Sequence, residues 1–171
     1  MKWLLLIVGA LVVLVGVIAL IGVLLPQSHV AVITRPYRAS PEQVWRTITD
    51  VESFANWRPG LQSAERLPSA AGRERWREKT GHDSLTIEIV EAAAPRRLVT
   101  RIADEGLPFG GTWTYELKPE AEGTELTITE HGEVYNPIFR FISKFVMGHT
   151  GTLEKYHEGL SNRLSAASSP R

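Results

Sequence analysis

The sequence contains no cysteine among its 171 residues. Disulfide bonds, thiol catalysis and cysteine-based zinc sites are therefore excluded, and this absence is compatible with either side of a membrane. The chain also lacks net charge, because 19 Lys and Arg residues balance 19 Asp and Glu residues. A balanced chain exerts no general attraction on a polyanion, so we expect no nucleic-acid partner.

Familiar catalytic motifs are missing as well. The sequence has neither the H-E-x-x-H pattern of zinc proteases nor the G-x-S-x-G pattern of serine hydrolases. The stretch "GLPFGG" is rich in glycine but lacks the Lys-Ser/Thr pair that a phosphate-binding loop requires. His149 and His157 are eight residues apart without a third ligand. We therefore expect neither a metal site nor a cofactor.

One long apolar run opens the chain. Residues 3–25 carry no charged side chain, and at about 1.5 Å per residue a helix of this length crosses the roughly 30 Å hydrocarbon core of a bilayer. The run has no polar face that would let it lie flat on a membrane. A cleaved signal peptide is the alternative, although its apolar region is usually about 7 to 15 residues long and "IGVLLPQSHV" offers no good cleavage site. We expect residues 1–26 to be a single-pass transmembrane anchor.

The charges that flank this run nearly balance. Lys2 and the amino terminus precede it, whereas Arg35 and Arg38 follow it. This pattern gives a small preference for an amino terminus inside and a soluble domain on the extracytoplasmic side. Because three residues reach at most about 10 Å, the domain that starts after Ser28 must lie close to the membrane surface.

The stretch "ASPEQVWRTITDVESFANWRPG", residues 39–60, predicts two short helices in tandem. Ser40 and Gln43 form a capping box, with proline at the first helical position. Trp45 is placed to join the core. Trp57 precedes a helix-breaking "RPG", so it either packs or lines the mouth of a cavity.

Seven segments show the two-residue alternation of strands and are separated by turn residues. They follow one another along the chain, which predicts a mostly antiparallel sheet. Their ranges are 29–37, 61–68, 73–80, 84–91, 98–103, 111–118 and 124–135.

Asn136 and Pro137 open the last element, which we expect to be one amphipathic helix that ends near Leu164. Its apolar stripe must lie against the sheet. Gly148 and Gly151 interrupt this stripe, and small residues there leave space that faces the sheet. Residues 166–171 are expected to be a disordered tail.

This order of elements resembles the helix-grip fold of the START-like, birch-pollen-allergen-like superfamily. The resemblance is carried by "SPEQVWRTITDVESFANWRP" and by "GTWTYELKPEAEGTELTITEHGEV", which is similar to polyketide cyclase/dehydrase-like members. It implies an α+β domain over residues 27–165, in which a seven-stranded antiparallel sheet wraps around a long carboxy-terminal helix. It also implies an apolar cavity, because members carry lipids, sterols, quinones or polyketides, and a minority are enzymes.

The expected ligand site lies between the sheet and the last helix, on the apolar faces of both. His149 is the one weak candidate for catalysis, as a proton shuttle with Tyr115 or Glu130, although a satisfied core histidine is the alternative. Glu130 and His131 must point to opposite faces of their strand. The expected ligand-binding residues are Trp57, Trp76, Trp113, Tyr115, Ile128, Ile142, Phe145, His149 and Leu153.

Charged residues alternate along "RERWREK", so one face of that strand is basic. The basic face either attracts anionic headgroups or is a solvated strand near the sheet edge. Glu88 and Arg101 either form a cross-strand pair or place a charge in the cavity.

Three functions fit these observations. The first is membrane-tethered binding of a hydrophobic small molecule such as a lipid, an isoprenoid or a polyketide. The second is a cyclase or dehydratase that uses the same cavity. The third is a protein-interaction domain with a filled core. The fold alone cannot choose among them.

Overall fold

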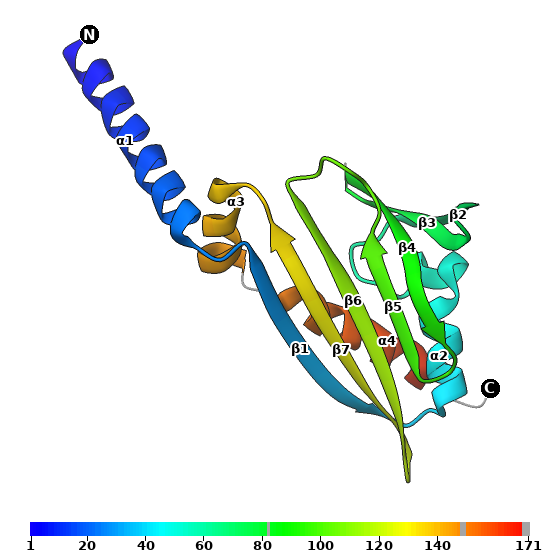
Figure 1. The fold of residues 1–171 in the computed structure, drawn as a ribbon. Helices are drawn as coiled ribbons and strands as arrows, with labels where there is room; N and C mark the ends of the chain where they lie inside the picture. Colours follow the sequence, from blue (N-terminus) through cyan, green and yellow to red (C-terminus); the bar gives the residue numbers. More distant parts are fainter. Residues whose placement is uncertain (82, 148–149, 169–171) are drawn as a thin grey trace.

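A single antiparallel sheet organises the computed structural model, which describes residues 1–81, 83–147 and 150–168. The strands lie in the order β1-β7-β6-β5-β4-β3-β2, so the first strand pairs with the last. Helices cover one face of this sheet, which confirms the expected α+β helix-grip architecture (Figure 1). The strands are β1 Ser28–Tyr37, β2 Ser63–Ala70, β3 Arg73–Thr80, β4 Asp83–Ala93, β5 Arg97–Ile102, β6 Phe109–Glu120 and β7 Gly123–Val134.

The two predicted short helices are α2, Pro41–Thr49, and the 3-10 helix η1, Val51–Asn56. The capping box forms as expected: Gln43 N donates to Ser40 Oγ over 3.3 Å, and Ser40 N donates to Gln43 Oε1 over 3.0 Å. The apolar side of α2 is buried, so these helices close one end of the concave face of the sheet.

Sheet register decides which side chains face the helices. Tyr115 lies opposite Ile128, and Leu117 lies opposite Leu126. Since alternate residues of a strand share a face, these positions define the inner face of β6 and β7. Leu126 and Ile128 are fully buried beneath the helices, and together with Leu153 they form the packed base of the core.

The prediction of one continuous helix from Asn136 to Leu164 is wrong. The chain instead forms α3, Pro137–Ile142, then a π-helical turn η2, Ser143–Met147, and then α4, Gly151–Ser168. A π turn adds a residue per turn, so apolar positions before and after it no longer share one face.

Only α4 of these segments follows the predicted course beneath the sheet, whereas α3 packs against α1 (Figure 1). Ile142 is consequently half-buried away from the grip, and Phe145 is 59% exposed. The helix α4 continues to Ser168, three residues into the expected tail. His149 lies outside the described residues.

The apolar helix α1, Lys2–Leu24, projects from the domain beside β1 (Figure 1). It is long and apolar enough to cross a membrane. Gly22 is buried where α1 meets α3. Glycine is required there, because a Cβ at this position would collide with the Pro137 carbonyl oxygen.

Candidate functional site: the inner chamber of the grip

The inner face of β6 changes from open to closed along its length. Trp113 and Tyr115 are half-buried, whereas Leu117, two residues further, is buried. Successive inner residues are about 7 Å apart along a strand. The inner face is therefore packed at its base and more accessible to solvent toward the start of β6. We call this more accessible part of the space between the sheet and α4 the inner chamber.

A partly buried ion pair, Arg58–Glu78, lies in the inner chamber. The Arg58 guanidinium, which follows η1, donates from both Nη atoms to the two carboxylate oxygens of Glu78 on β3, and the Nη2 to Oε2 distance is 2.9 Å. Trp76 Nε1 donates to Glu78 Oε1 over 2.7 Å. The guanidinium also lies 5.0 Å from the ring centre of Phe54 and 5.4 Å from that of Tyr156. Such contacts stabilise a desolvated cation.

The Arg58 guanidinium stays charged although it is partly buried. Burial acts to lower the pKa of Arg58, but the adjacent Glu78 carboxylate outweighs burial and leaves that pKa raised. The guanidinium is therefore a cation whose charge is already neutralised by a bidentate partner. The pair presents no net charge to the rest of the inner chamber.

Two tyrosines adjoin the ion pair. Tyr115 on β6 and Tyr156 on α4 have ring centres 5.7 Å apart. Burial raises the pKa of Tyr115 and raises that of Tyr156 further, since its neighbour Tyr115 adds to the effect. Both phenols are protonated at neutral pH, so each remains able to donate a hydrogen bond. Trp57 packs edge-on against Tyr156 with ring centres 5.2 Å apart.

A second polar group lies nearer the start of β6. Glu130 Oε2 accepts a hydrogen bond from Trp113 Nε1 over 3.1 Å, and Glu130 Oε1 lies 3.5 Å from His29 Nε2. Gly132 faces His29 across the β1–β7 pair, and a Cβ there would collide with the imidazole ring. The absence of a Cβ at Gly132 therefore leaves room for the His29 ring.

Two hollows border the inner chamber. The larger, about 560 Å³, lies at the end of the sheet where β1, β6 and β7 meet the β5–β6 loop, and we call it the mouth. Its lining includes His29 and Ile102 of the inner face together with Val30, Arg101, Thr112 and His131 of the outer face. Its volume falls within the range of about 300 to 1,000 Å³ that is common for ligand sites. The smaller, about 270 Å³, lies beneath α2 and η1 and is lined mainly by apolar side chains such as Phe54 and Trp76.

The base of the domain holds a separate buried pair. Tyr37 Oη lies 2.7 Å from His157 Nδ1, and His157 has no exposed surface. Burial is the main reason why the pKa of His157 is lowered to about 4, and it also raises the pKa of Tyr37. His157 is thus neutral at physiological pH, and its position in the packed base indicates a structural role.

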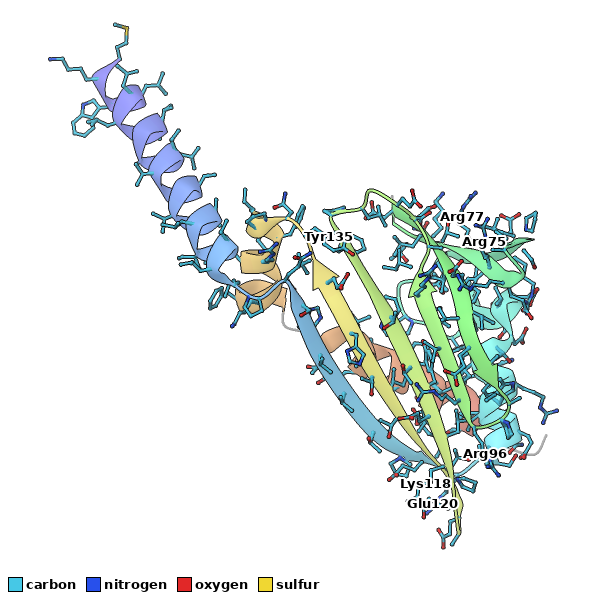
Figure 2. All side chains as sticks on the ribbon, in the orientation of Figure 1. Arg75, Arg77, Arg96, Lys118, Glu120 and Tyr135 are labelled. Carbon is cyan, nitrogen blue, oxygen red and sulfur yellow. The ribbon has the colours of Figure 1, made fainter. Side chains whose placement is uncertain are left out.

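The outer face of the sheet carries a cluster of charged side chains around Glu88. Glu88 accepts from Arg101 Nε over 2.6 Å and from Arg73 Nη1 over 3.1 Å. The cross-strand pair predicted from the sequence therefore forms, and it places no charge in the inner chamber. Arg75 and Arg77 project from the same basic face of β3 (Figure 2). No three His, Asp or Glu side chains gather as metal ligands would within residues 1–81, 83–147 and 150–168.

The structure brings some of the predicted ligand-binding residues together and separates others. Trp57, Trp76 and Tyr115 surround the Arg58–Glu78 pair, and Trp113 lies toward the mouth. Ile128 and Leu153 belong to the packed base, Ile142 and Phe145 lie near α1, and His149 is outside the described residues.

Sequence analysis missed Arg58, Glu78 and His29 as site residues. A signal for Glu78 was present, since it shares the inner face of its strand with Trp76. Arg58 directly follows Trp57, but nothing in the sequence indicates that its charge is buried. His29 is recognisable only once β1 is known to pair with β7.

Comparison with protein families gives a match over residues 29–162 to the family described as polyketide cyclase/dehydrase and lipid transport. Curated proteins give no match. Among solved structures, a protein of Thermus thermophilus is similar with a TM-score of 0.69 and 26% identity, over 82% of this chain and 100% of its own.

Two more distant structures show the same fold. The START superfamily protein of Mycobacterium smegmatis has a TM-score of 0.66 and 18% identity, over 82% of this chain and 99% of its own. Norcoclaurine synthase of Thalictrum flavum, solved with a transition-state analogue, has a TM-score of 0.65 and 11% identity, over 83% of this chain and 97% of its own.

Proposed function

This chain belongs to the polyketide cyclase/dehydrase and lipid transport family, and from that premise we propose that it is a membrane-tethered protein that binds one hydrophobic small molecule in the inner chamber. The observation that carries the proposal is the half-buried aromatic and polar inner surface of β6, formed by Trp113 and Tyr115. A hollow of about 560 Å³ lies at the same end of the sheet. Apolar sites with a few placed polar groups are typical of small-molecule binding.

The polar groups favour a neutral, oxygen-bearing ligand. Arg58 is already paired with Glu78, so a carboxylate ligand would have to compete with a bidentate partner. The Tyr115 and Tyr156 hydroxyls are protonated and can donate to a carbonyl or hydroxyl oxygen. An isoprenoid, a polyketide-like ring system or a lipid with a neutral polar group meets both conditions.

Retention of α1 as a membrane anchor is supported by its contact with the domain. Arg140 Nη1 donates to the Gly22 carbonyl over 3.4 Å. Gly22 has no side chain, which leaves room for the backbone of Pro137. A cleaved signal peptide makes no lasting packing contact with the mature protein. These contacts therefore favour a tether over a signal sequence.

The enzyme alternative, a cyclase or dehydratase, is supported by one feature. Glu130 and His29 form an acid/base pair, and His29 lines the mouth. If the protein is an enzyme, Glu130→Gln abolishes turnover of a bound ligand without abolishing its binding.

The binding proposal is tested by purifying the full chain in detergent and analysing organic extracts by mass spectrometry. We expect an apolar compound to co-purify with the protein. The double variant Tyr115→Phe with Tyr156→Phe removes two donors and is expected to retain about tenfold less of it. Tyr37→Phe removes a buried phenol hydroxyl at the closed base and serves as the control, with unchanged retention. Repeated absence of any co-purifying or exchangeable apolar compound would contradict the proposal.

A further inference from the structure

The short helix α3 packs against the carboxy-terminal end of α1. Ile18, Ala19 and Ile21 are half-buried and Gly22 is buried, whereas residues 1–17 are exposed along the whole of their length. This covered stretch coincides with the contact between α1 and α3, which Figure 1 shows at the foot of α1. The last two turns of the apolar helix thus face protein on one side.

The position of this contact along α1 fixes the depth of α3. A bilayer core of roughly 30 Å requires about 20 helical residues, and the apolar run ends at Leu25. Ile18 lies about 10 Å before Leu25 along the helix axis, at about 1.5 Å per residue. If α1 spans the bilayer, Ile18 lies within the hydrocarbon, and a helix packed against it cannot remain entirely in water.

Three large apolar side chains lie on the free surface of α3 and the π turn. Ile138 is 39% exposed, Phe139 is 51% exposed and Phe145 is 59% exposed. Phe141 and Phe145 pack together with ring centres 4.9 Å apart. Clustered aromatic residues beside a membrane span are typical of segments that lie in the interface between lipid and water.

Basic groups lie at the same level. Arg140 Nε donates to the Val134 carbonyl over 2.7 Å and Arg140 Nη2 to the Tyr135 carbonyl over 3.0 Å, which fixes the guanidinium at the junction of β7 and α3. A hollow of about 370 Å³ beside it is lined by Leu25, Arg140 and Lys144, among others. This hollow opens where the chain leaves α1, at the level expected for lipid phosphates.

We propose that α3 and the π turn form an interfacial element that lies in the bilayer surface beside α1, with Phe139 and Phe145 among the acyl chains and Lys144 at anionic headgroups. The partner is an anionic phospholipid surface. The proposal rests on the membrane tether of the proposed function. It also places the mouth of the inner chamber at the bilayer, because β7 ends only three residues before α3 begins.

The absence of native cysteine allows a direct test of depth. Single cysteines replace Phe139, Phe145, Leu14 or Val90 in the full chain, and each carries an environment-sensitive fluorophore. The variants are reconstituted in phosphatidylcholine–phosphatidylglycerol vesicles that contain nitroxide lipids. Val90, 44% exposed on β4, is the matched apolar control, and Leu14 reports the span itself.

We expect shallow nitroxides to quench the labels at 139 and 145 at least several-fold more than the label at 90. Deep nitroxides should quench the label at 14. If 14 is quenched while 139 and 145 behave like 90, the tether stands and the interfacial element is refuted. If 14 is not quenched, both the tether and this inference are overturned.

A charge variant tests the headgroup contact. One lysine at an anionic surface changes the docked population by about fivefold, so Lys144→Gln should reduce quenching at 139 in vesicles that contain phosphatidylglycerol and leave it unchanged in pure phosphatidylcholine. Lys118→Gln is the control, since Lys118 lies at the far end of the molecule from α1 (Figure 2). An equal effect of both variants, or no effect of Lys144→Gln, would contradict the anionic contact.

Discussion

Arg58 keeps its charge inside the domain because Glu78 accepts two of its hydrogen bonds. The buried carboxylate also accepts from Trp76, so three side chains from two segments depend on one another. The cost of desolvating such a pair is large, and its attraction offsets that cost only while both partners are present. The pair therefore contributes to the shape of the inner chamber more than to net stability.

Removing one partner of this pair should be destabilising. In Glu78→Gln the amide still accepts from Trp76, but the Arg58 cation loses its counterion, so we expect the free energy of unfolding to fall by about 3 kcal/mol. Urea denaturation followed by tryptophan fluorescence measures this change. Glu74→Gln breaks an exposed pair with Arg66 and is the control, with a loss below about 1 kcal/mol. Equal losses in the two variants would refute the argument.

His157 should make stability depend on pH. Its pKa is about 4 in the folded chain against an ordinary value of 6.5, so between these values the unfolded chain binds more protons. The contribution of His157 is therefore fully present above pH 6.5 and is lost as the pH falls toward 4, by about 3 kcal/mol in total. Unfolding free energies measured across this interval should flatten in His157→Gln but not in His131→Gln, a change at an exposed position. An unchanged slope in His157→Gln would show that other groups control this range.

The burial of individual side chains was predictable only where it follows from the sequence pattern. Trp57 and Tyr115 were expected in the site because large aromatic side chains on an apolar face are rarely left in water. Arg58 could not be predicted, since a lone arginine after a helix is normally solvated and its partner is 20 residues away. Buried charge depends on tertiary geometry, which periodicity does not encode.

Helix α2 shows how a local signal determines an element. Ser40 and Gln43 satisfy each other's backbone donors, and Val44 then enters the core at 0% exposure. Both facts follow from spacing alone. The division of the last helix is different, because "NPIFRFISKFVMGHT" shows helical spacing throughout. The departure of α3 toward α1 is a tertiary effect that overrides the local period.

Loss of the capping box should weaken α2 by a measurable amount. Ser40→Ala removes the acceptor for Gln43 N, and we expect a loss of about 1 kcal/mol in the free energy of unfolding. Ser84→Ala, at an exposed position on β4, is the comparison and should change stability by less than about 0.5 kcal/mol. Identical unfolding curves for the two variants would mean that the cap is energetically silent.

Apart from the division of the last helix, the fold was predictable from the order of its elements and from the family resemblance that this order carries. Seven consecutive strands that are interrupted only by two short helices allow few sheet topologies, because antiparallel neighbours in sequence usually pair. The exception, the pairing of β1 with β7, closes the concave face over α4. The mouth and its hollow follow from how tightly these parts pack, and packing volumes are not visible in a linear sequence.

The orientation of the whole molecule is a further prediction. Because Lys2 and the amino terminus precede the span, we expect the domain to face the extracytoplasmic side. In intact cells, a cysteine that replaces Val90 should react with a membrane-impermeant maleimide, whereas a cysteine that replaces Lys2 should react only after permeabilisation. The reverse labelling pattern would place the domain in the cytoplasm.

The short connection between α1 and β1 has a consequence for traffic. Strand β1 begins at Ser28, four residues after α1 ends at Leu24, and Arg140 of α3 donates a hydrogen bond to the Gly22 carbonyl of α1. If α1 spans the bilayer as proposed, a domain fastened this closely cannot ferry cargo through water between distant compartments. The proposed ligand would then arrive by lateral diffusion in the same leaflet, and a recipient would have to come to it there, so exchange would be confined to two dimensions.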